Sequence, residues 1–304
     1  MGTIALTRLP APADLLALAK PRIVTLVTVT AAAGYALGVR ALPEGQYPAS
    51  STAALLWVLL HAALGTALVA GGTSALNQVL ERDVDARMRR TANRPLPAGR
   101  LTPRTATVFA WTIAALGVAE LLAYVNPLTA LLAAATLVVY VFAYTPMKRH
   151  THLSTLVGAI PGALPIVGGW TAAGAPLDGR PAALFAILFL WQLPHSLALA
   201  WLYREDYARA SLRMLSVDDA SGIATFRQAA LNAAALLPVS LAPVAVAMAG
   251  RVYFVVALAL SIALLVLTLQ GVRDPTPRRA RRLFLATLAY LPLLLGVLVA
   301  FPLR

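Results

Sequence analysis

The chain has 304 residues, of which 60% are hydrophobic and 12% are charged, and its mean hydropathy is +0.76. Soluble domains carry about twice that charged fraction, so the composition excludes an ordinary soluble domain and indicates a polytopic helical membrane protein. No cysteine is present, which excludes disulfides and thiolate metal sites.

Apolar stretches of about 20 residues, the length of helix needed to cross a bilayer, recur from end to end. We predict one all-α domain over residues 1–304 with nine transmembrane helices. The predicted spans are residues 15–39, 53–76, 104–124, 127–146, 153–173, 182–203, 225–248, 252–271 and 281–302. The first thirteen residues lack the pattern of a cleavable signal, so we expect the first span to be retained.

Basic residues are distributed unevenly between the two sides of this predicted bundle. Of the 25 lysines and arginines, 21 fall on one side, and only Arg40, Arg180, Arg251 and Arg304 fall on the other. The positive-inside rule therefore predicts a cytoplasmic amino terminus and a carboxyl terminus outside. This topology accounts for the net charge of +13 without a nucleic-acid partner. Apart from Asp14, eight of the twelve acidic residues also lie on the cytoplasmic side, which the rule does not explain and a dedicated site does.

A polar stretch, residues 77–95, follows the second span. Asn77, Glu81 and Asp85 recur every four residues, so on a helix their side chains share one face. Three oxygen ligands surrounded by arginines suit a hard divalent cation that carries a phosphate group. A solvated loop with internal ion pairs is the alternative, and the stretch alone leaves both open.

Three further segments carry charge at the predicted cytoplasmic side. After the sixth span, Asp206 is the natural partner acid, whereas Glu205 and Arg209 are spaced for a helix-surface ion pair. Lys148 closes the fourth span and is interpreted either as a phosphate-facing lysine or as a lysine that extends to the membrane surface. Residues 20–22, at the start of the first span, allow the same two interpretations.

Two histidines lie inside predicted spans, where a polar side chain is costly unless it has a partner or a function. His195 follows Trp191 and Gln192 in the sixth span, and it could ligate haem iron, carry a proton or hydrogen-bond Gln192. His61, in the second span, is open to the same interpretations.

Glycines and prolines concentrate at residues 158–169 of the fifth span. They predict either a close approach of neighbouring helices or room for a large flat ligand. Trp57, Trp111 and Trp170, near predicted span ends, are interpreted as anchors at the membrane interface.

Taken together, these residues resemble the UbiA-type intramembrane prenyltransferases. That family has an Asn-x-x-x-Asp-x-x-x-Asp motif after its second helix, a Tyr-x-x-x-Lys element after its fourth and a second acidic motif after its sixth of nine helices. The matching residues are Asn77, Glu81, Asp85, Tyr144, Lys148 and Asp206. More narrowly, residues 88–96, 144–149, 162–170, 191–195 and 206–215 resemble the haem O synthases, or protoheme IX farnesyltransferases.

Two departures from the family pattern bear on the site. Glu81 stands where Asp is usual and still offers a carboxylate, and Ala210 stands where the wider family has the last Asp of the second motif. The haem O synthases generally lack that acid. The resemblance extends from about residue 20 to residue 217, and the last three spans add little to it.

The resemblance implies transfer of the farnesyl group of farnesyl diphosphate to a vinyl group of haem B, with Mg²⁺ as cofactor. The implied metal ligands and catalytic residues are Asn77, Glu81, Asp85 and Asp206. The implied diphosphate-binding residues are Arg22, Arg89, Arg94, Tyr144, Lys148 and Arg149, and His195 is the implied ligand of haem iron. The implied setting is a bacterial inner membrane with the site on its cytoplasmic side, and haem A synthase or terminal oxidase assembly are the implied partners.

Two rival functions are weighed against this one. A member of the same family could prenylate a quinone precursor or a chlorophyll-type ring, and analysis of the product would separate the two. A transporter of an anionic substrate is the rival from another class. Transporters place polar groups near the middle of the bilayer, whereas the polar groups of this chain cluster in loops at one side.

Overall fold

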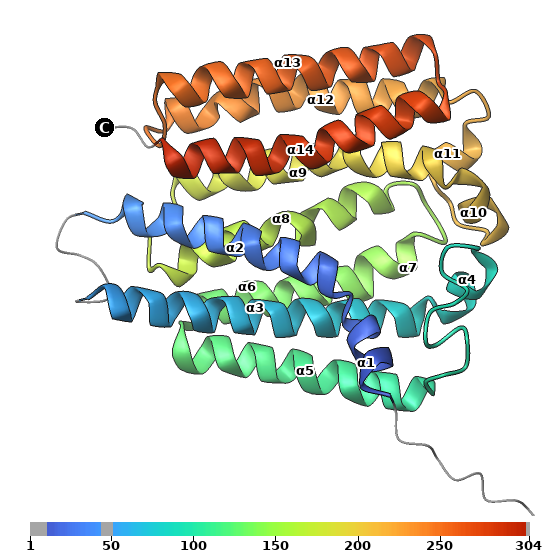
Figure 1. Cartoon of the computed structure of the whole chain (residues 1–304), viewed down its shortest axis with the longest axis horizontal. Coiled ribbons are helices and arrows are strands. Elements are labelled where there is room, and N and C mark those ends of the chain that lie inside the picture. The colour runs from blue at the N-terminus through green and yellow to red at the C-terminus, as the bar shows by residue number, and fades with distance from the viewer. Residues whose placement is uncertain (1–10, 44–50, 302–304) are drawn as a thin grey trace, which may run out of the picture.

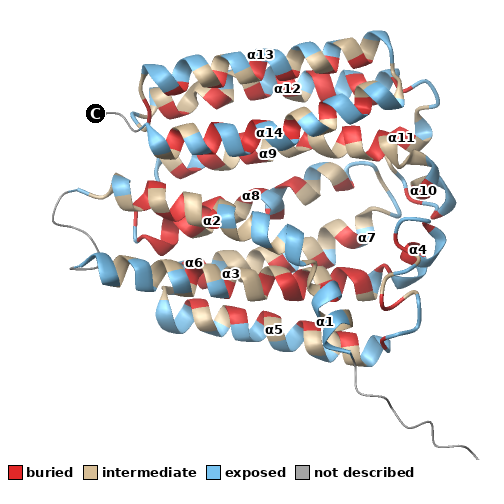
Figure 2. Ribbon diagram, viewed as in Figure 1, coloured by how far each residue is buried: buried red, intermediate tan, exposed pale blue. Residues whose placement is uncertain are grey.

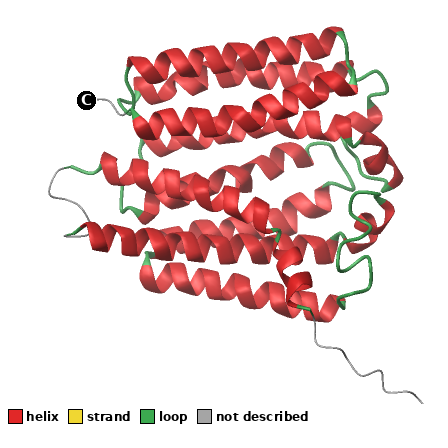
Figure 3. Ribbon diagram, viewed as in Figure 1, coloured by secondary structure: helices red, strands yellow, loops and turns green. Residues whose placement is uncertain are grey.

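The structure, a computed structural model, describes residues 11–43 and 51–301. Within these ranges it consists of helices joined by loops, without a strand (Figure 3). Residue 302, the predicted end of the ninth span, and Arg304 lie outside the described residues. The orientation of the bundle in the membrane remains a prediction from the basic residues.

Nine helices of the described part are long and apolar enough to cross a membrane. They are α2 (Pro21–Ala41), α3 (Thr52–Leu80), α5 (Pro103–Tyr124), the continuous α6 (Pro127–Val138), η1 (Val139–Tyr144) and α7 (Thr145–Met147), α8 (Ser154–Ala172), α9 (Gly179–Leu202), α12 (Ile223–Ala245), α13 (Arg251–Arg273) and α14 (Pro277–Ala300). They run side by side along one bundle (Figure 1). The predicted all-α bundle of nine spans is confirmed.

The first predicted span is corrected in one respect. Residues 15–39 were expected to form one helix, but the chain forms a short helix α1 (Pro12–Ala19) and then α2, with Lys20 between them in the left-handed region at φ 52°. The ring of Pro21 disfavours right-handed helical backbone at the residue before it and suits the first turn of a new helix. The proline therefore places a break where hydropathy alone predicts continuity.

The fourth predicted span also differs from a uniform helix. Between α6 and α7 the backbone of η1 adopts a π-helix, in which each turn holds more residues than an α-turn. The segment ends at Tyr144, the first residue of the Tyr-x-x-x-Lys element. Hydropathy contains no signal for this change, because the helix remains continuous and apolar through it.

The predicted close approach at the fifth span is confirmed. A Cβ atom on Gly169 of α8 would lie 1.8 Å from the carbonyl oxygen of Ala31 on α2, and one on Gly34 would lie 2.0 Å from the carbonyl oxygen of Ile166. Only glycine permits two helix backbones to pass at this distance. The pair α2 and α8 is thereby held together across the middle of the bundle.

The predicted tryptophan anchors divide into two kinds. Trp57 and Trp111 are 56% and 43% exposed on the outer surface, as an anchor would be. Trp170 is fully buried, and its ring nitrogen donates a hydrogen bond to the carbonyl of Pro176 at 2.9 Å. The interpretation of Trp170 as an interfacial anchor is therefore wrong, because it belongs to the packed interior.

The outward faces of the helices are largely exposed, and the buried residues face neighbouring helices (Figure 2). Many of these exposed side chains are large and apolar, as expected of surfaces in contact with lipid tails. His61 of α3 is held between two helices instead. Its Nδ1 lies 2.5 Å from a carboxylate oxygen of Glu120 on α5, and its ring stacks on that of Tyr124. This partner gives His61 a structural role in joining α3 to α5.

Three short helices gather at one end of the bundle, here called the loop end (Figure 1). They are α4 (Arg82–Arg87), α10 (Arg204–Arg209) and α11 (Leu215–Asp218). Val84 and Met88 from the first polar loop pack in one buried cluster with Ala210 and Leu212 from the second. Apolar packing thus brings together the two loops that carry most of the acidic residues.

Candidate active site

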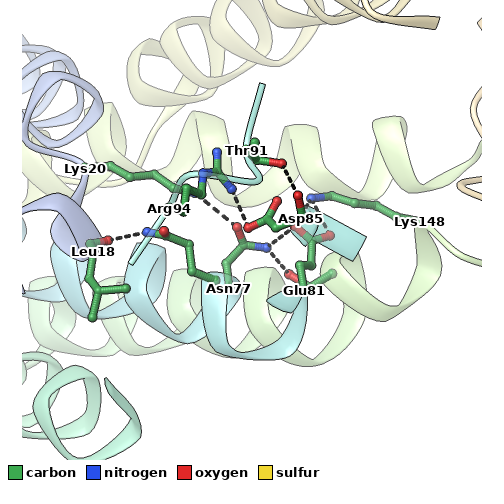
Figure 4. A network of polar contacts seen from close by, with 10 residues as sticks. Leu18, Lys20, Asn77, Glu81, Asp85, Thr91, Arg94 and Lys148 are labelled. Atoms are coloured by element: carbon green, nitrogen blue, oxygen red, sulfur yellow. Dashed lines mark hydrogen bonds and ion pairs between the residues drawn. The ribbon is translucent and has the colours of Figure 1, made fainter. Parts of the chain in front are cut away.

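Three of the predicted ligand residues converge at the loop end of α3. Asn77, Glu81 and Asp85 are all buried, and Nδ2 of Asn77 donates to Oε2 of Glu81 at 2.9 Å (Figure 4). The helix is interrupted at Glu81, but the amide of Asp85 still donates to the carbonyl of Glu81 at 2.7 Å. This bond keeps the spacing close to helical, so the predicted shared face is preserved.

Glu81 is paired with Lys148, which arrives from the end of α7. Nζ of Lys148 lies 2.9 Å from Oε1 of Glu81 and 4.4 Å from the centre of the Tyr144 ring. Burial by itself lowers the pKa of Lys148, but Tyr144 and Glu81 outweigh burial and raise the pKa above its ordinary value. Lys148 is therefore a fixed cation, as a phosphate-facing lysine needs to be.

Among the described residues, one of the two carboxylate oxygens of Asp85 has a hydrogen-bond partner and the other has none. Its Oδ2 accepts a hydrogen bond from Nη1 of Arg94 at 2.6 Å, and its backbone carbonyl accepts one from Thr91 at 2.8 Å. Its Oδ1 is buried and has no hydrogen-bond partner among the described residues. Buried carboxylate oxygens are almost always satisfied, so an orphaned one points to a ligand.

Lys20 completes the cluster, although the sequence did not single it out above Arg22. Its Nζ donates to Oδ1 of Asn77 at 3.1 Å. Burial, followed by the nearby cations of Arg94 and Lys148, lowers the pKa of Lys20 to about 7. The only signal in the sequence was the Lys-Pro step, because the break before Pro21 places Lys20 beside α3.

Asp206, the predicted partner acid, lies in the second loop. Its Oδ1 accepts from the backbone amide of Arg89 at 3.2 Å and from the guanidinium of Arg209. Burial raises the pKa of Asp206, but the bonds from Arg89 and Arg90 and the Arg209 cation outweigh burial and lower the pKa. Across residues 11–43 and 51–301, no three acidic or histidine side chains are arranged to hold a metal ion. Asp206 is thus near the cluster without being assembled into it.

Of the six residues predicted for diphosphate, three join the cluster: Arg94, Tyr144 and Lys148. Arg22, Arg89 and Arg149 have exposed side chains at the loop end. The Arg149 guanidinium contacts the backbone carbonyl of Leu80 at 3.3 Å rather than an acid. The structure therefore brings together half of this predicted set.

His195 lies apart from these residues, where α9 packs on α14. Its Nδ1 is 2.9 Å from Oγ1 of Thr287, and its ring packs against Phe284 with centroids 4.8 Å apart and Trp191 with centroids 5.3 Å apart. Gln192 instead donates to backbone carbonyls of α8 and α9. The sequence alternative of a His195–Gln192 hydrogen bond is therefore wrong, because the partner is on another helix.

A cavity of about 200 Å³ lies next to the polar cluster, between α2, α3, α6, η1 and α8. Its lining is mostly apolar. At the loop end it reaches Ser74, about one turn before Asn77 on α3, and Tyr140, about one turn before Tyr144. Cations and oxygen ligands thus lie about one turn beyond one end of an apolar cavity, an arrangement that can hold an anionic head with its hydrocarbon tail.

The chain matches the UbiA prenyltransferase family over residues 25–293. It is 45% identical over 287 residues to a protoheme IX farnesyltransferase of Solibacter usitatus, covering 94% of this chain and 97% of that one. It is 48% identical over 282 residues to a protoheme IX farnesyltransferase of Anaeromyxobacter sp. strain Fw109-5, covering 92% and 90%.

Solved structures show the same fold at low sequence identity. A digeranylgeranylglyceryl phosphate synthase structure aligns with a TM-score of 0.76 at 13% identity, covering 95% of this chain and 97% of that one. A UbiA homolog from Archaeoglobus fulgidus bound to GPP and Mg²⁺ aligns with a TM-score of 0.60 at 16% identity, covering 94% and 99%. The chain therefore belongs to the UbiA prenyltransferase family and is a prenyltransferase, similar over nearly its whole length to protoheme IX farnesyltransferases.

Proposed function

We propose that this chain transfers the farnesyl group of farnesyl diphosphate to a vinyl group of haem B. The allylic C–O bond breaks and diphosphate leaves with the bonding electrons. The terminal vinyl carbon then forms a C–C bond to the farnesyl carbon, and water adds to the neighbouring carbon with loss of one proton. The products are haem O, which carries a hydroxyethylfarnesyl side chain, and diphosphate.

The observation that carries the proposal is the orphaned oxygen of Asp85 in a buried polar cluster that begins about one turn beyond the cavity. Two carboxylates, one amide oxygen and a nearby third acid are hard oxygen donors of the kind Mg²⁺ prefers. We propose that Asn77, Glu81, Asp85 and Asp206 hold Mg²⁺ together with the diphosphate. When bound, Mg²⁺ supplies positive charge that stabilises the departing diphosphate.

The cations of the cluster are proposed to bind the diphosphate itself. Lys20, Arg94 and Lys148 each contact one of the oxygen donors. Phosphate oxygens are strong acceptors for the same groups, so we expect these cations to shift onto the diphosphate when the donors take up the metal. For Arg22, Arg89 and Arg149, exposed at the same end, we propose attraction of the anionic substrate.

For the acceptor, we propose that His195 ligates the haem iron. Thr287 holds one ring nitrogen, and this kind of hydrogen bond fixes the orientation of a ligating imidazole. The rings of Phe284 and Trp191 beside it offer flat apolar surfaces of the kind a porphyrin packs against. Farnesyl transfer further requires that one bound haem reaches from His195, with Phe284 and Trp191 beside it, to the farnesyl diphosphate held at the polar cluster.

The cellular setting follows from charge and from the relatives. The loop end carries most of the basic residues, so we propose that it faces the cytoplasm. The relatives are bacterial, which supports a bacterial inner membrane. Haem A synthase or terminal oxidase assembly remain proposed partners.

The direct test incubates membranes containing the chain with haem B, farnesyl diphosphate and MgCl₂, followed by mass spectrometry of the extracted haem. We expect a product heavier by one farnesyl group and one hydroxyl group, and none when EDTA replaces MgCl₂. A prenylated quinone precursor in place of the haem product would favour the rival acceptor. Transport of the substrate without release of diphosphate would contradict the proposed enzymatic function and favour the transporter.

A further inference from the structure

Gly168 differs from its neighbouring glycines on α8. A Cβ atom on Gly162 would lie 2.1 Å from Oε1 of Gln192, and one on Gly169 would lie 1.8 Å from a backbone oxygen of α2. A Cβ atom on Gly168 would meet nothing within 4 Å, although this residue lines the cavity. Helix packing therefore explains Gly162 and Gly169, whereas at Gly168 the lack of a side chain only adds space to the cavity.

The same end of the cavity is closed by hydrogen bonds between α6 and α8. Oγ1 of Thr129 lies 2.9 Å from Oγ1 of Thr171 and 3.5 Å from the carbonyl oxygen of Gly168. Nδ2 of Asn126 donates to the carbonyl of Thr171 at 2.8 Å. We call Thr129, Gly168 and Thr171 the cavity floor. It is polar, whereas the walls above it are mostly apolar.

The distance from the polar cluster to the far end of the cavity corresponds to a short isoprenoid. On α3 the lining extends to Thr66, eleven residues before Asn77. At 1.5 Å per residue this separation is about 16 Å. Three isoprene units, each advancing about 5 Å at ordinary bond lengths, span about the same distance.

We propose that the cavity floor is a length stop for the prenyl tail, and that Gly168 leaves the room occupied by the third isoprene unit. The inference rests on the proposed function and deepens it by assigning residues that select the prenyl substrate. A longer tail must press apolar carbon against Thr129, which lines the cavity and is hydrogen-bonded to Thr171 outside the lining. This is unfavourable because displacing the Thr129 hydroxyl leaves both polar groups without their partners. A side chain at Gly168 would shorten the apolar path instead.

The test compares Gly168→Ala, Gly168→Val and Thr129→Ala with the full-length wild type in detergent. Each protein is assayed for kcat and KM with geranyl, farnesyl and geranylgeranyl diphosphate at saturating haem B. One methylene in an apolar pocket changes discrimination by about 10- to 200-fold. We expect the geranyl-to-farnesyl ratio of kcat/KM to rise at least about tenfold in Gly168→Val and less in Gly168→Ala. Thr129→Ala should raise the geranylgeranyl-to-farnesyl ratio.

Gly296→Val is the matched control. Gly296 lies on the exposed face of α14, where a Cβ atom would also meet nothing within 4 Å. The control introduces the same β-branched side chain into a membrane helix outside the cavity, and it should keep the wild-type chain-length ratios. The length stop is contradicted if both Gly168 variants keep the wild-type ratios of kcat/KM between the three diphosphates. It is also contradicted if Gly296→Val changes these ratios as much as Gly168→Val does. If Gly168→Val does not fold, the chain-length ratios of Gly168→Ala decide the question. Alanine is a better helix former than glycine, and its Cβ atom meets no neighbour at this position.

A binding measurement without haem separates this inference from the proposed function. Non-reactive thiolodiphosphate analogues of the three chain lengths are titrated in Mg²⁺ buffer, and the thermal midpoint is recorded. A wild type that binds none of them contradicts the proposed function. A wild type that binds them while Gly168→Val leaves the order of affinities unchanged contradicts the length stop alone.

Discussion

Asp85→Asn separates the role of this carboxylate in catalysis from its role in folding. Asp85 is 1% exposed. Its Oδ2 accepts a hydrogen bond from Arg94 at 2.6 Å, and its Oδ1 has no hydrogen-bond partner among the described residues. Losing a hydrogen bond between charged groups costs about 1.5–3 kcal/mol, and an unsatisfied buried group costs about 1–3 kcal/mol. The amide oxygen of Asn can still accept from Arg94, so the first bond is weakened rather than lost. The amide nitrogen replaces the orphaned oxygen, so one unsatisfied buried group is exchanged for another. We therefore expect the unfolding free energy of the ligand-free protein to change by less than about 2 kcal/mol.

Activity should respond much more strongly than stability. Removing one preorganised electrostatic group from an active site costs about 10²–10³-fold in kcat, or about 3–4 kcal/mol. The assay measures kcat/KM for haem O formation in purified protein, together with the thermal midpoint with and without MgCl₂ and a farnesyl thiolodiphosphate. Asp83→Asn is the matched control, because Asp83 is exposed and pairs with the neighbouring Arg82. A kcat/KM for Asp85→Asn within threefold of wild type, with the ligand-induced shift retained, refutes the assignment.

Three further substitutions test separate parts of the molecule. Lys148→Gln should lower kcat/KM by about 100-fold, because it removes a fixed cation beside the proposed diphosphate, whereas Arg87→Gln, on the exposed face of α4, should stay near wild type. His195→Ala should weaken haem binding and change the absorption spectrum of bound haem; an unaltered spectrum excludes it as iron ligand. Asp219→Asn should cost about 1 kcal/mol at pH 7, because Asp219 accepts hydrogen bonds at the start of α12. These bonds overcome the effect of burial and lower the pKa of Asp219, so its stabilisation is present above about pH 4 and lost as pH falls through the folded-state pKa. Thermal midpoints of wild type and variant at pH 7 and pH 3 should show this difference shrinking, and a difference that does not shrink contradicts the role of the carboxylate.

The sequence predicted the bundle well because membrane spans are set by length and hydropathy, which are local properties. It also predicted the convergence of Asn77, Glu81 and Asp85, since a four-residue spacing survives the interruption at Glu81. The break at Lys20 was within reach of the sequence, because proline restricts the residue before it. Hydropathy alone had assigned both sides of that break to one span.

Other parts of the site could not be predicted from the sequence. An arginine in a loop has a long side chain that can turn inward or outward, and the charge pattern is the same for Arg94, which pairs with Asp85, and for Arg89, which is exposed. The partner of His195 is Thr287, 92 residues later in the chain, so no local motif contains it. The role of Gly168 depends on space that only the packing of α2, α3, α6 and α8 defines.

The π-helical segment η1 decides which way the end of the fourth span faces. Each residue inserted into an α-helix rotates everything after it by about 100°, because a turn holds 3.6 residues. Lys148 follows this insertion and contacts both Glu81 and the ring of Tyr144, the last residue of η1. Deleting one residue between 139 and 143 would leave the hydropathy of the span almost unchanged and turn the lysine away from its acid. Under the proposed function, the angular phase of this membrane helix is a catalytic property, and no measure of apolar length detects it.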